Sequence, residues 1–95
     1  KNDTAGAINV FRELVRRDPN FAEGHNNLGL MLLQANRLGE AQQEFTLAVH
    51  LKPQYAEAHF NLGLTLHQEG NEAESQQEFE RAYAIEPALK PEPHP

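Results

Sequence analysis

The 95-residue sequence contains no cysteine. A disulfide framework, a thiolate zinc site and a thiol nucleophile are therefore excluded. The absence of cysteine fits a cytosolic protein but does not exclude an exported one. No apolar run approaches the ~18 residues of a membrane-spanning helix. The first ten residues also lack the charged and then apolar order that marks a signal peptide.

The sequence is also poor in basic residues. Eight Lys and Arg stand against 14 Asp and Glu, which gives a formal net charge of −6. The imbalance lies mainly in residues 55–95, where two basic residues stand against eight glutamates. An acidic surface repels the phosphates of nucleic acids and of anionic lipids. We therefore expect neither a nucleic acid nor an anionic membrane surface as a partner.

What the sequence does contain is an internal repeat. Residues 22–55 and 56–89 align without a gap and are identical at 16 of 34 positions. A fixed period of this length is typical of one supersecondary unit stacked on copies of itself. Such stacks usually offer surfaces for binding, because each unit contacts only its neighbours and no enclosed pocket forms. The repeat therefore predicts a class of function without naming a partner.

Each repeat contains two stretches with helical periodicity. Leu28, Leu32 and Ala35 recur at intervals of four and three residues, and Phe45 and Ala48 repeat the pattern in the second stretch. These intervals place the apolar side chains on one face of an α-helix and do not fit the alternation of a strand. The pattern predicts five helices, over residues 5–17, 22–35, 39–51, 56–69 and 73–86. Because the predicted loops are short, neighbouring helices are expected to be antiparallel.

The first predicted helix corresponds to the second half of an earlier repeat, because Phe11 and Pro19 stand 34 residues before Phe45 and Pro53. The array is thus expected to span residues 1–89, with a half repeat at 5–20 and repeats at 21–54 and 55–88. Residues 90–95 cannot continue it, since every second residue there is proline. Alternating prolines favour an extended, polyproline-like segment. This Pro-rich tail ends the array, links it to a further segment, or serves as a short docking strip.

Small and large side chains follow the same order in both repeats. The marker residues are His25, Leu28, Gly29, Leu32, Ala41, Phe45, Ala48 and Pro53, then His59, Leu62, Gly63, Leu66, Ser75, Phe79, Ala82 and Pro87. This order resembles the tetratricopeptide repeat, whose 34-residue pattern is W-x2-L-G-x2-Y, then A-x3-F, then P. The sequence departs from it in three ways: His replaces the large aromatic residue, Leu replaces Tyr, and Ser75 replaces Ala. The resemblance implies an all-α, right-handed superhelical solenoid of about five antiparallel helices.

The order of small and large residues can also be explained by how the helices pack. Gly29 and Ala41 are small where the two helices of one unit must approach closely, whereas Leu28 and Phe45 are large where the next unit leaves a gap. Each unit alone would expose an apolar face, so the stability of the array comes from stacking.

The resemblance also implies an inner groove, lined mainly by the first helix of each repeat. Its candidate residues are Glu23, Asn26, Asn27, Leu30, Leu33 and Gln34, then Glu57, Phe60, Asn61, Leu64, His67 and Gln68. Asn27 and Asn61 stand one repeat apart, and an amide at this position could hold the backbone of an extended ligand. The alternative is that these two side chains are solvated or brace the neighbouring helix.

The charges of the candidate residues indicate what the groove would bind. Some members of the family hold a C-terminal carboxylate with a cluster of Lys, Arg and Asn. No Lys or Arg is among the candidate residues here, so this clamp is missing. Glu23 and Glu57 beside Leu30 and Leu64 instead predict an apolar or basic peptide, for example an amphipathic helix.

The histidines and carboxylates show no catalytic or metal-binding pattern. His25 and His59 stand where the family has a packed aromatic residue, so we expect a structural role. His59 and His67 do not have the i, i+4 spacing of a helical zinc site. No Ser-His-Asp set, Gly-rich phosphate loop or pair of carboxylates in a cleft is visible. We therefore expect no catalytic residue, no metal, no cofactor and no enzymatic activity.

The two ends of the array carry apolar residues that nothing in the sequence covers. Val10 and Val15 lie at the start, and Tyr83 and Ile85 at the end. Three functions remain open on the sequence. The first is a protein–protein interaction scaffold that binds a peptide or helix in the groove. The second is a self-association module acting through the uncapped ends. The third is a non-catalytic arm of a larger enzyme, such as a glycosyltransferase.

Overall fold

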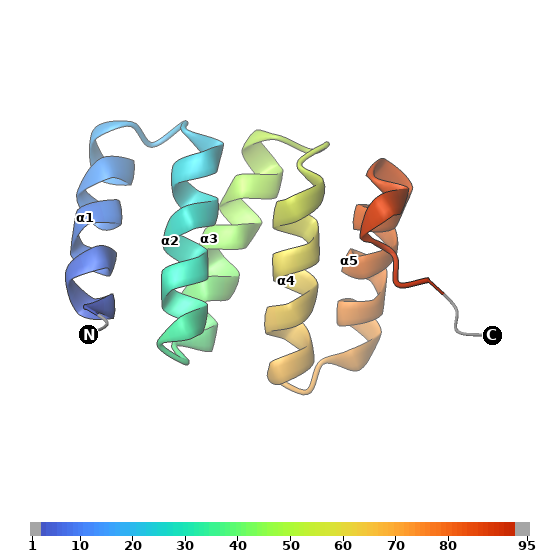
Figure 1. Cartoon of the computed structure of the whole chain (residues 1–95). Helices are drawn as coiled ribbons and strands as arrows, with labels where there is room; N and C mark the ends of the chain where they lie inside the picture. Colours follow the sequence, from blue (N-terminus) through green and yellow to red (C-terminus); the bar gives the residue numbers. More distant parts are fainter. Residues whose placement is uncertain (1–2, 93–95) are drawn as a thin grey trace.

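The structure is a computed structural model that describes residues 3–92. Within this range the chain forms five α-helices and one short 3-10 helix. They are α1 (Thr4–Arg17), α2 (Ala22–Gln34), α3 (Leu38–Leu51), α4 (Ala56–Gln68), α5 (Glu72–Ile85) and η1 (Pro87–Leu89). Figure 1 shows the helices in a row, with α1 and α5 at opposite ends. Each of the five predicted helices is present, and every boundary agrees with the prediction to within one residue.

Three prolines explain where α1, α3 and α5 end. Asp18, Lys52 and Glu86 each precede a proline, and their backbones leave the helical region at φ −133°, −139° and −135°. A proline ring clashes with a helical conformation of the residue before it, so the helix stops there. Each of these three residues still donates its N–H to a carbonyl in the last turn. Of the predicted Pro-rich tail, residues 93–95 lie outside the described range, and Lys90 is extended at φ −71°, ψ 130°.

The turns inside the two repeats use a left-handed residue at the same place. Asn36 has φ 60° and Gly70, one repeat later, has φ 86°. The residue after each donates its N–H to a carbonyl of the preceding helix, at 2.8 Å for Arg37 to Leu32 and 2.9 Å for Asn71 to Leu66. This geometry ends the first helix of each repeat and turns the chain back for the second.

Two exposed glycines should respond oppositely to replacement by alanine. A Cβ at Gly39 or at Gly70 would meet nothing within 4 Å, but only Gly70 has a positive φ. Gly39→Ala should raise the free energy of unfolding by up to about 1 kcal/mol, because alanine is the better helix former. Gly70→Ala should lower it by about 1 kcal/mol, because a Cβ is strained in the left-handed region. Urea unfolding of both variants checks the pair, and a stabilising Gly70→Ala would contradict this account of the turn.

The core lies where a phenylalanine of the second helix of a repeat meets a glycine of the first. A Cβ added at Gly29 would lie 2.6 Å from the ring of Phe45, and one added at Gly63 would lie 2.8 Å from Phe79. Only glycine allows the rings to approach the helix backbone this closely. Ser75 replaces the alanine of the repeat without a buried unpaired hydroxyl, because its Oγ donates to the carbonyl of Gly63 at 2.8 Å.

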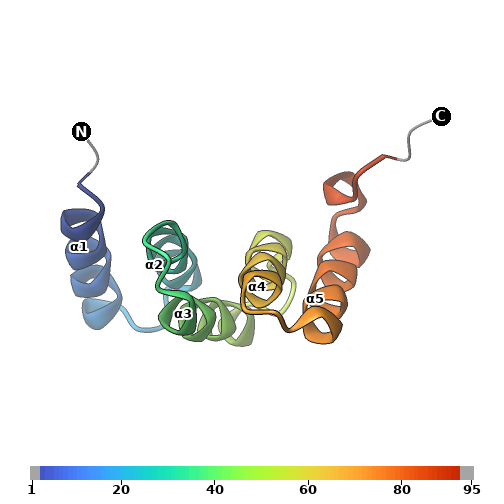
Figure 2. The same cartoon turned by 90° about the horizontal axis from the view of Figure 1, so that it is seen from below.

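The helices pack more extensively within each repeat than between neighbouring repeats. The most extensive contacts join α2 to α3 and α4 to α5, and smaller ones join α1 to α2 and α3 to α4. Seen from below, α2 and α4 lie on one side of α3, with α1 and α5 flanking them (Figure 2). The molecule is elongated, with extents of 44 × 28 × 23 Å. Within residues 3–92, no helix is both long and apolar enough to cross a membrane.

Candidate binding surface

The twelve candidate residues all lie on α2 and α4, the first helices of the two complete repeats. We call the side of the molecule that carries them the α2/α4 surface. Four of the twelve are exposed, namely Gln34, Glu57, His67 and Gln68. Six are partly exposed, namely Glu23, Asn27, Leu30, Leu33, Phe60 and Leu64. The remaining two, Asn26 and Asn61, are buried.

The apolar residues of this surface are partly buried against the core and partly exposed to solvent. Leu30 and Leu33 pack against the core cluster around Leu28, Leu32 and Phe45, yet both remain partly exposed. A surface of half-buried leucines can bury further apolar area against a ligand without a large rearrangement of its own side chains.

The asparagines differ although they occupy equivalent places. Asn61 is 5% exposed and donates its amide to Asn26 Oδ1 at 3.1 Å, and Asn26 itself is only 1% exposed. This hydrogen bond joins α4 to α2. Asn61 therefore braces the neighbouring helix, which is the alternative to contact with a ligand. Asn27 remains partly exposed. Thus only Asn27 of the equivalent pair is partly exposed to solvent.

The charge of Glu23 is balanced by a residue that the sequence pattern did not single out. Lys52, at the end of α3, places its Nζ 3.1 Å from Glu23 Oε2, and this hydrogen bond lowers the pKa of Glu23. The same Nζ lies 4.8 Å from the centroid of the Tyr55 ring. Burial raises the pKa of Tyr55, with further contributions from Glu57 and Glu23. A lysine before the terminating proline was visible in the sequence, but its contact with α2 depends on how α2 and α3 pack against each other within the repeat.

Phe60 belongs to a cluster of three aromatic rings between α4 and α5. Its centroid lies 5.2 Å from that of Phe79 and 6.5 Å from that of Tyr83. The rings of Phe79 and Tyr83 are stacked, with their centroids 6.1 Å apart and their planes at 8°. All three side chains remain partly exposed.

The two buried histidines connect three segments in the same way in both repeats. His25 Nδ1 lies 2.7 Å from Glu44 Oε1, and its Nε2 lies 2.8 Å from the carbonyl oxygen of Pro19. His59 repeats these contacts with Glu78 at 2.8 Å and with Pro53 at 2.9 Å. Carbonyl and carboxylate oxygens are acceptors, so both bonds form together when the ring carries a proton on each nitrogen. This geometry agrees with the predicted structural role.

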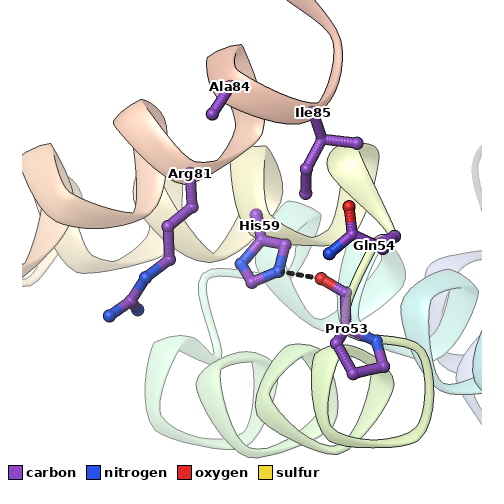
Figure 3. Close-up of a pocket in the computed structure, with 6 residues that line it drawn as sticks. All are labelled: Pro53, Gln54, His59, Arg81, Ala84 and Ile85. Atoms are coloured by element: carbon purple, nitrogen blue, oxygen red, sulfur yellow. Dashed lines mark hydrogen bonds between the residues drawn. The ribbon is translucent and has the colours of Figure 1, made fainter.

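A cavity of about 460 Å³ opens beside His59. It is lined by Pro53, Gln54, His59, Arg81, Ala84 and Ile85. Figure 3 shows the His59 ring at the Pro53 carbonyl, with Ala84 and Ile85 contributed by α5. The cavity is open to solvent, and Arg81, which lines it, bonds to Glu78. None of the twelve candidate residues lines it, so the cavity is distinct from the α2/α4 surface.

Within residues 3–92, no group of three or more His, Asp or Glu side chains is placed to hold a metal ion. His67 of the α2/α4 surface pairs with Glu72, at 2.8 Å.

Comparison with protein families matches two tetratricopeptide repeat models to the chain, one over residues 1–56 and one over residues 56–89. The chain belongs to the tetratricopeptide repeat family. The fold is therefore an all-α tetratricopeptide repeat solenoid, as predicted. No curated protein matches the chain in sequence.

Solved tetratricopeptide repeat structures share the fold at low sequence identity. A crystal structure of MamA superposes with a TM-score of 0.85 at 19% identity, covering 93% of this chain and 52% of that one. YrrB, described as a TPR protein with an unusual peptide-binding site, gives 0.84 at 24% identity, with 88% and 43% covered. A CopN-Scc3 complex gives 0.83 at 22% identity, with 87% and 49% covered. The chain thus spans about half the length of these proteins. Tetratricopeptide repeats generally serve as protein-interaction scaffolds, and this chain is of that class.

Proposed function

We propose that this chain binds an apolar or basic peptide, or an amphipathic helix, on the α2/α4 surface. The observation that supports this most directly is that Leu30 and Leu33 on α2 and Phe60 and Leu64 on α4 are all partly exposed, and that the exposed Glu57 lies one turn before Phe60 on α4. Apolar side chains on a ligand would gain burial there, and a Lys or Arg on the ligand would meet Glu57.

The charges near this surface indicate which class of ligand it would bind. Lys52 already neutralises Glu23, so Glu57 is the carboxylate of the twelve residues that is left to select a basic ligand. No Lys or Arg belongs to the twelve, and Lys52, which contacts them, is already paired with Glu23, so these residues do not favour an acidic peptide. The peptide-binding site of YrrB and the assembly in the CopN-Scc3 complex support a peptide or protein as the ligand class. Capture is non-covalent, and no residue on this surface is assigned a catalytic role.

Reversing one charge on this surface should weaken binding of a basic ligand. Peptides would be selected on the wild-type chain from a random display library, and their affinities measured by fluorescence anisotropy. Glu57→Lys should weaken a selected basic peptide by about tenfold, because it removes an attractive charge and adds a repulsive one. Glu74→Lys is the matched control, since Glu74 is equally a single exposed glutamate but lies on α5. Acidic selected peptides, or equal losses in the two variants, would contradict the proposal.

Alanine variants of the two equivalent asparagines should differ: one should change the affinity for the selected peptide, and the other should change the free energy of unfolding. Asn27→Ala should weaken the selected peptide and leave the free energy of unfolding nearly unchanged. Asn61→Ala should lower the free energy of unfolding by about 1–2 kcal/mol, because it removes a buried hydrogen bond and leaves Asn26 Oδ1 without its donor. If Asn27→Ala leaves the affinity unchanged, the role of the Asn27 amide in holding the ligand is wrong.

A further inference from the structure

An aromatic ring, two carboxylates and an ammonium group lie near one another where the first complete repeat joins the second. The Nζ atom of Lys52 lies 3.1 Å from Glu23 Oε2 and 4.8 Å from the centroid of the Tyr55 ring. Burial raises the pKa of Tyr55, and the negative charges of Glu57 and Glu23 raise it further, so both carboxylates act on this side chain. A positive charge here is thus held by an aromatic face and by anionic groups, which is how proteins bind organic cations.

These residues belong to the α2/α4 surface or adjoin it. Glu23 lies on α2 and Glu57 on α4, and both are among the twelve residues of that surface. Lys52 and Tyr55 lie in the turn between α3 and α4. A complete repeat lies on each side of this turn, so the exposure of these side chains is set by the fold and not by either end of the chain.

The lysine distinguishes this turn from the equivalent turns of the chain. The other two residues that precede a helix-terminating proline, Asp18 and Glu86, are acidic. The end of α3 does not require a lysine, because a proline disfavours a helical conformation of the residue before it whatever its side chain. The contacts with Glu23 and Tyr55 are therefore what sets Lys52 apart from its two counterparts.

Lys52 is held only weakly in this position. Its side chain is 51% exposed, and that of Glu23 is 46% exposed. An ion pair with this much exposure contributes little to stability, because water solvates both charges well when they separate. Glu57, the second carboxylate, is exposed as well. A cation that arrives on a ligand can therefore take the place of the Lys52 ammonium at small cost.

A guanidinium suits this group of side chains better than the ammonium that occupies it. An ammonium is a compact and strongly hydrated charge, whereas a guanidinium is planar, more weakly hydrated and able to stack on an aromatic face. Its N–H donors all lie in the plane of the group, so it can stack on Tyr55 and still donate to a carboxylate.

We propose that Tyr55, Glu23 and Glu57 form a subsite for an arginine side chain of the ligand, and that Lys52 occupies this subsite until the ligand displaces it. The inference rests on the proposed function, because it names the residue that a basic peptide inserts on the α2/α4 surface. Displacement of Lys52 frees Glu23, whose charge then acts on the arginine together with that of Glu57. Lys52 is thus an internal competitor, and removing it should strengthen the binding of a basic ligand.

Titration with Nα-acetyl-arginine amide, followed by nuclear magnetic resonance, tests the subsite on the 95-residue chain without a selected peptide. Lys52→Met should bind this probe about threefold or more tightly than wild type, because the competitor is gone, and the largest amide shifts should lie around Tyr55. Lys90→Met is the matched control, since Lys90 is also exposed and its loss changes the net charge equally. It should leave the affinity unchanged. The uncharged isostere Nα-acetyl-citrulline amide should bind to neither variant.

A second substitution separates the subsite from a general effect of charge. In the Lys52→Met background, Tyr55→Leu should abolish the gain in affinity, whereas Tyr55→Phe, which keeps the ring, should retain it. Circular dichroism establishes that each variant keeps its helices. Equal affinities of Lys52→Met and Lys90→Met would overturn the subsite. So would a gain that survives Tyr55→Leu, because the gain would then come from net charge alone.

The selected peptides distinguish failure of the subsite from failure of the proposed function. If Glu57→Lys weakens a selected basic peptide but the arginine probe does not respond to Lys52→Met, the subsite is wrong and the α2/α4 surface still binds a peptide. If the probe binds around Tyr55 in Lys52→Met but no basic peptide is selected, the cation subsite stands and the proposed function is wrong.

Discussion

Replacing Phe45 by alanine is expected to lower the free energy of unfolding by about 3–5 kcal/mol, the range for deleting a fully buried phenyl ring. Phe45 has no exposed area and belongs to the core cluster with Leu28, Leu32 and Leu62. Its ring also packs on Gly29, where the missing Cβ leaves room for it. The part of the cavity next to Gly29 has no side chain of that residue to fill it. Urea unfolding followed by circular dichroism at 222 nm measures the change.

Phe79→Ala is the matched control for this prediction. Phe79 occupies the same place in the second repeat and packs on Gly63 in the same way, but it remains partly exposed. The loss should therefore be smaller by about 1–2 kcal/mol, in proportion to the smaller area removed from water. Equal losses in the two variants would show that the open side of α5 is covered in solution. Comparing dilute with concentrated samples would then tell whether a second copy is responsible, because association raises stability by mass action.

His25→Ala should lower the free energy of unfolding by about 2–3 kcal/mol, because it removes a buried ring and leaves its two partly buried acceptor contacts unmade. The ring is 6% exposed and lies between Glu44 on α3 and the carbonyl of Pro19 in the loop before α2. Its removal therefore disconnects the loop, α2 and α3 at one point. The measurement is again urea unfolding.

His59→Ala, in the second repeat, is the matched control for His25→Ala. His59→Ala should be less destabilising, by about 1 kcal/mol, because Glu78 keeps a charged donor in Arg81. The position equivalent to Arg81 in the first repeat is Leu47, so Glu44 has no such replacement. If His59→Ala were the more damaging of the two, the contribution assigned to Arg81 would be wrong.

The repeat pattern was sufficient to predict the helices, because their boundaries depend on local chemistry. Pro19, Pro53 and Pro87 stop helices whatever surrounds them, and Asn36 and Gly70 tolerate the left-handed turn that a helical hairpin needs. The pairing of Gly29 with Phe45 likewise follows from spacing alone, since both residues face the partner helix of the same repeat.

The exposure and contacts of the candidate residues could be predicted only in part. Asn27 and Asn61 are equivalent in the sequence, yet Asn61 is buried because Asn26, across from it on α2, accepts its hydrogen bond. The partner of Glu23 was not predicted either, because Lys52 reaches it from a different helix 29 residues away. The first contact joins neighbouring repeats and the second joins the two helices of one repeat, and the spacing of residues along one helix carries no information about which side chains meet across helices.

The sequence by itself therefore determined the helices, the family and the small-to-large packing inside each repeat, since these follow from contacts between residues close along the chain. Only the tertiary structure decided which equivalent residues of the two repeats differ in exposure. Phe45 is buried and Phe79 is not, because α4 packs on α3 and no helix of residues 3–92 packs on α5 in the same way. Identical residue types thus acquire different exposure from their place in the stack, and exposure determines which of them can bind a partner.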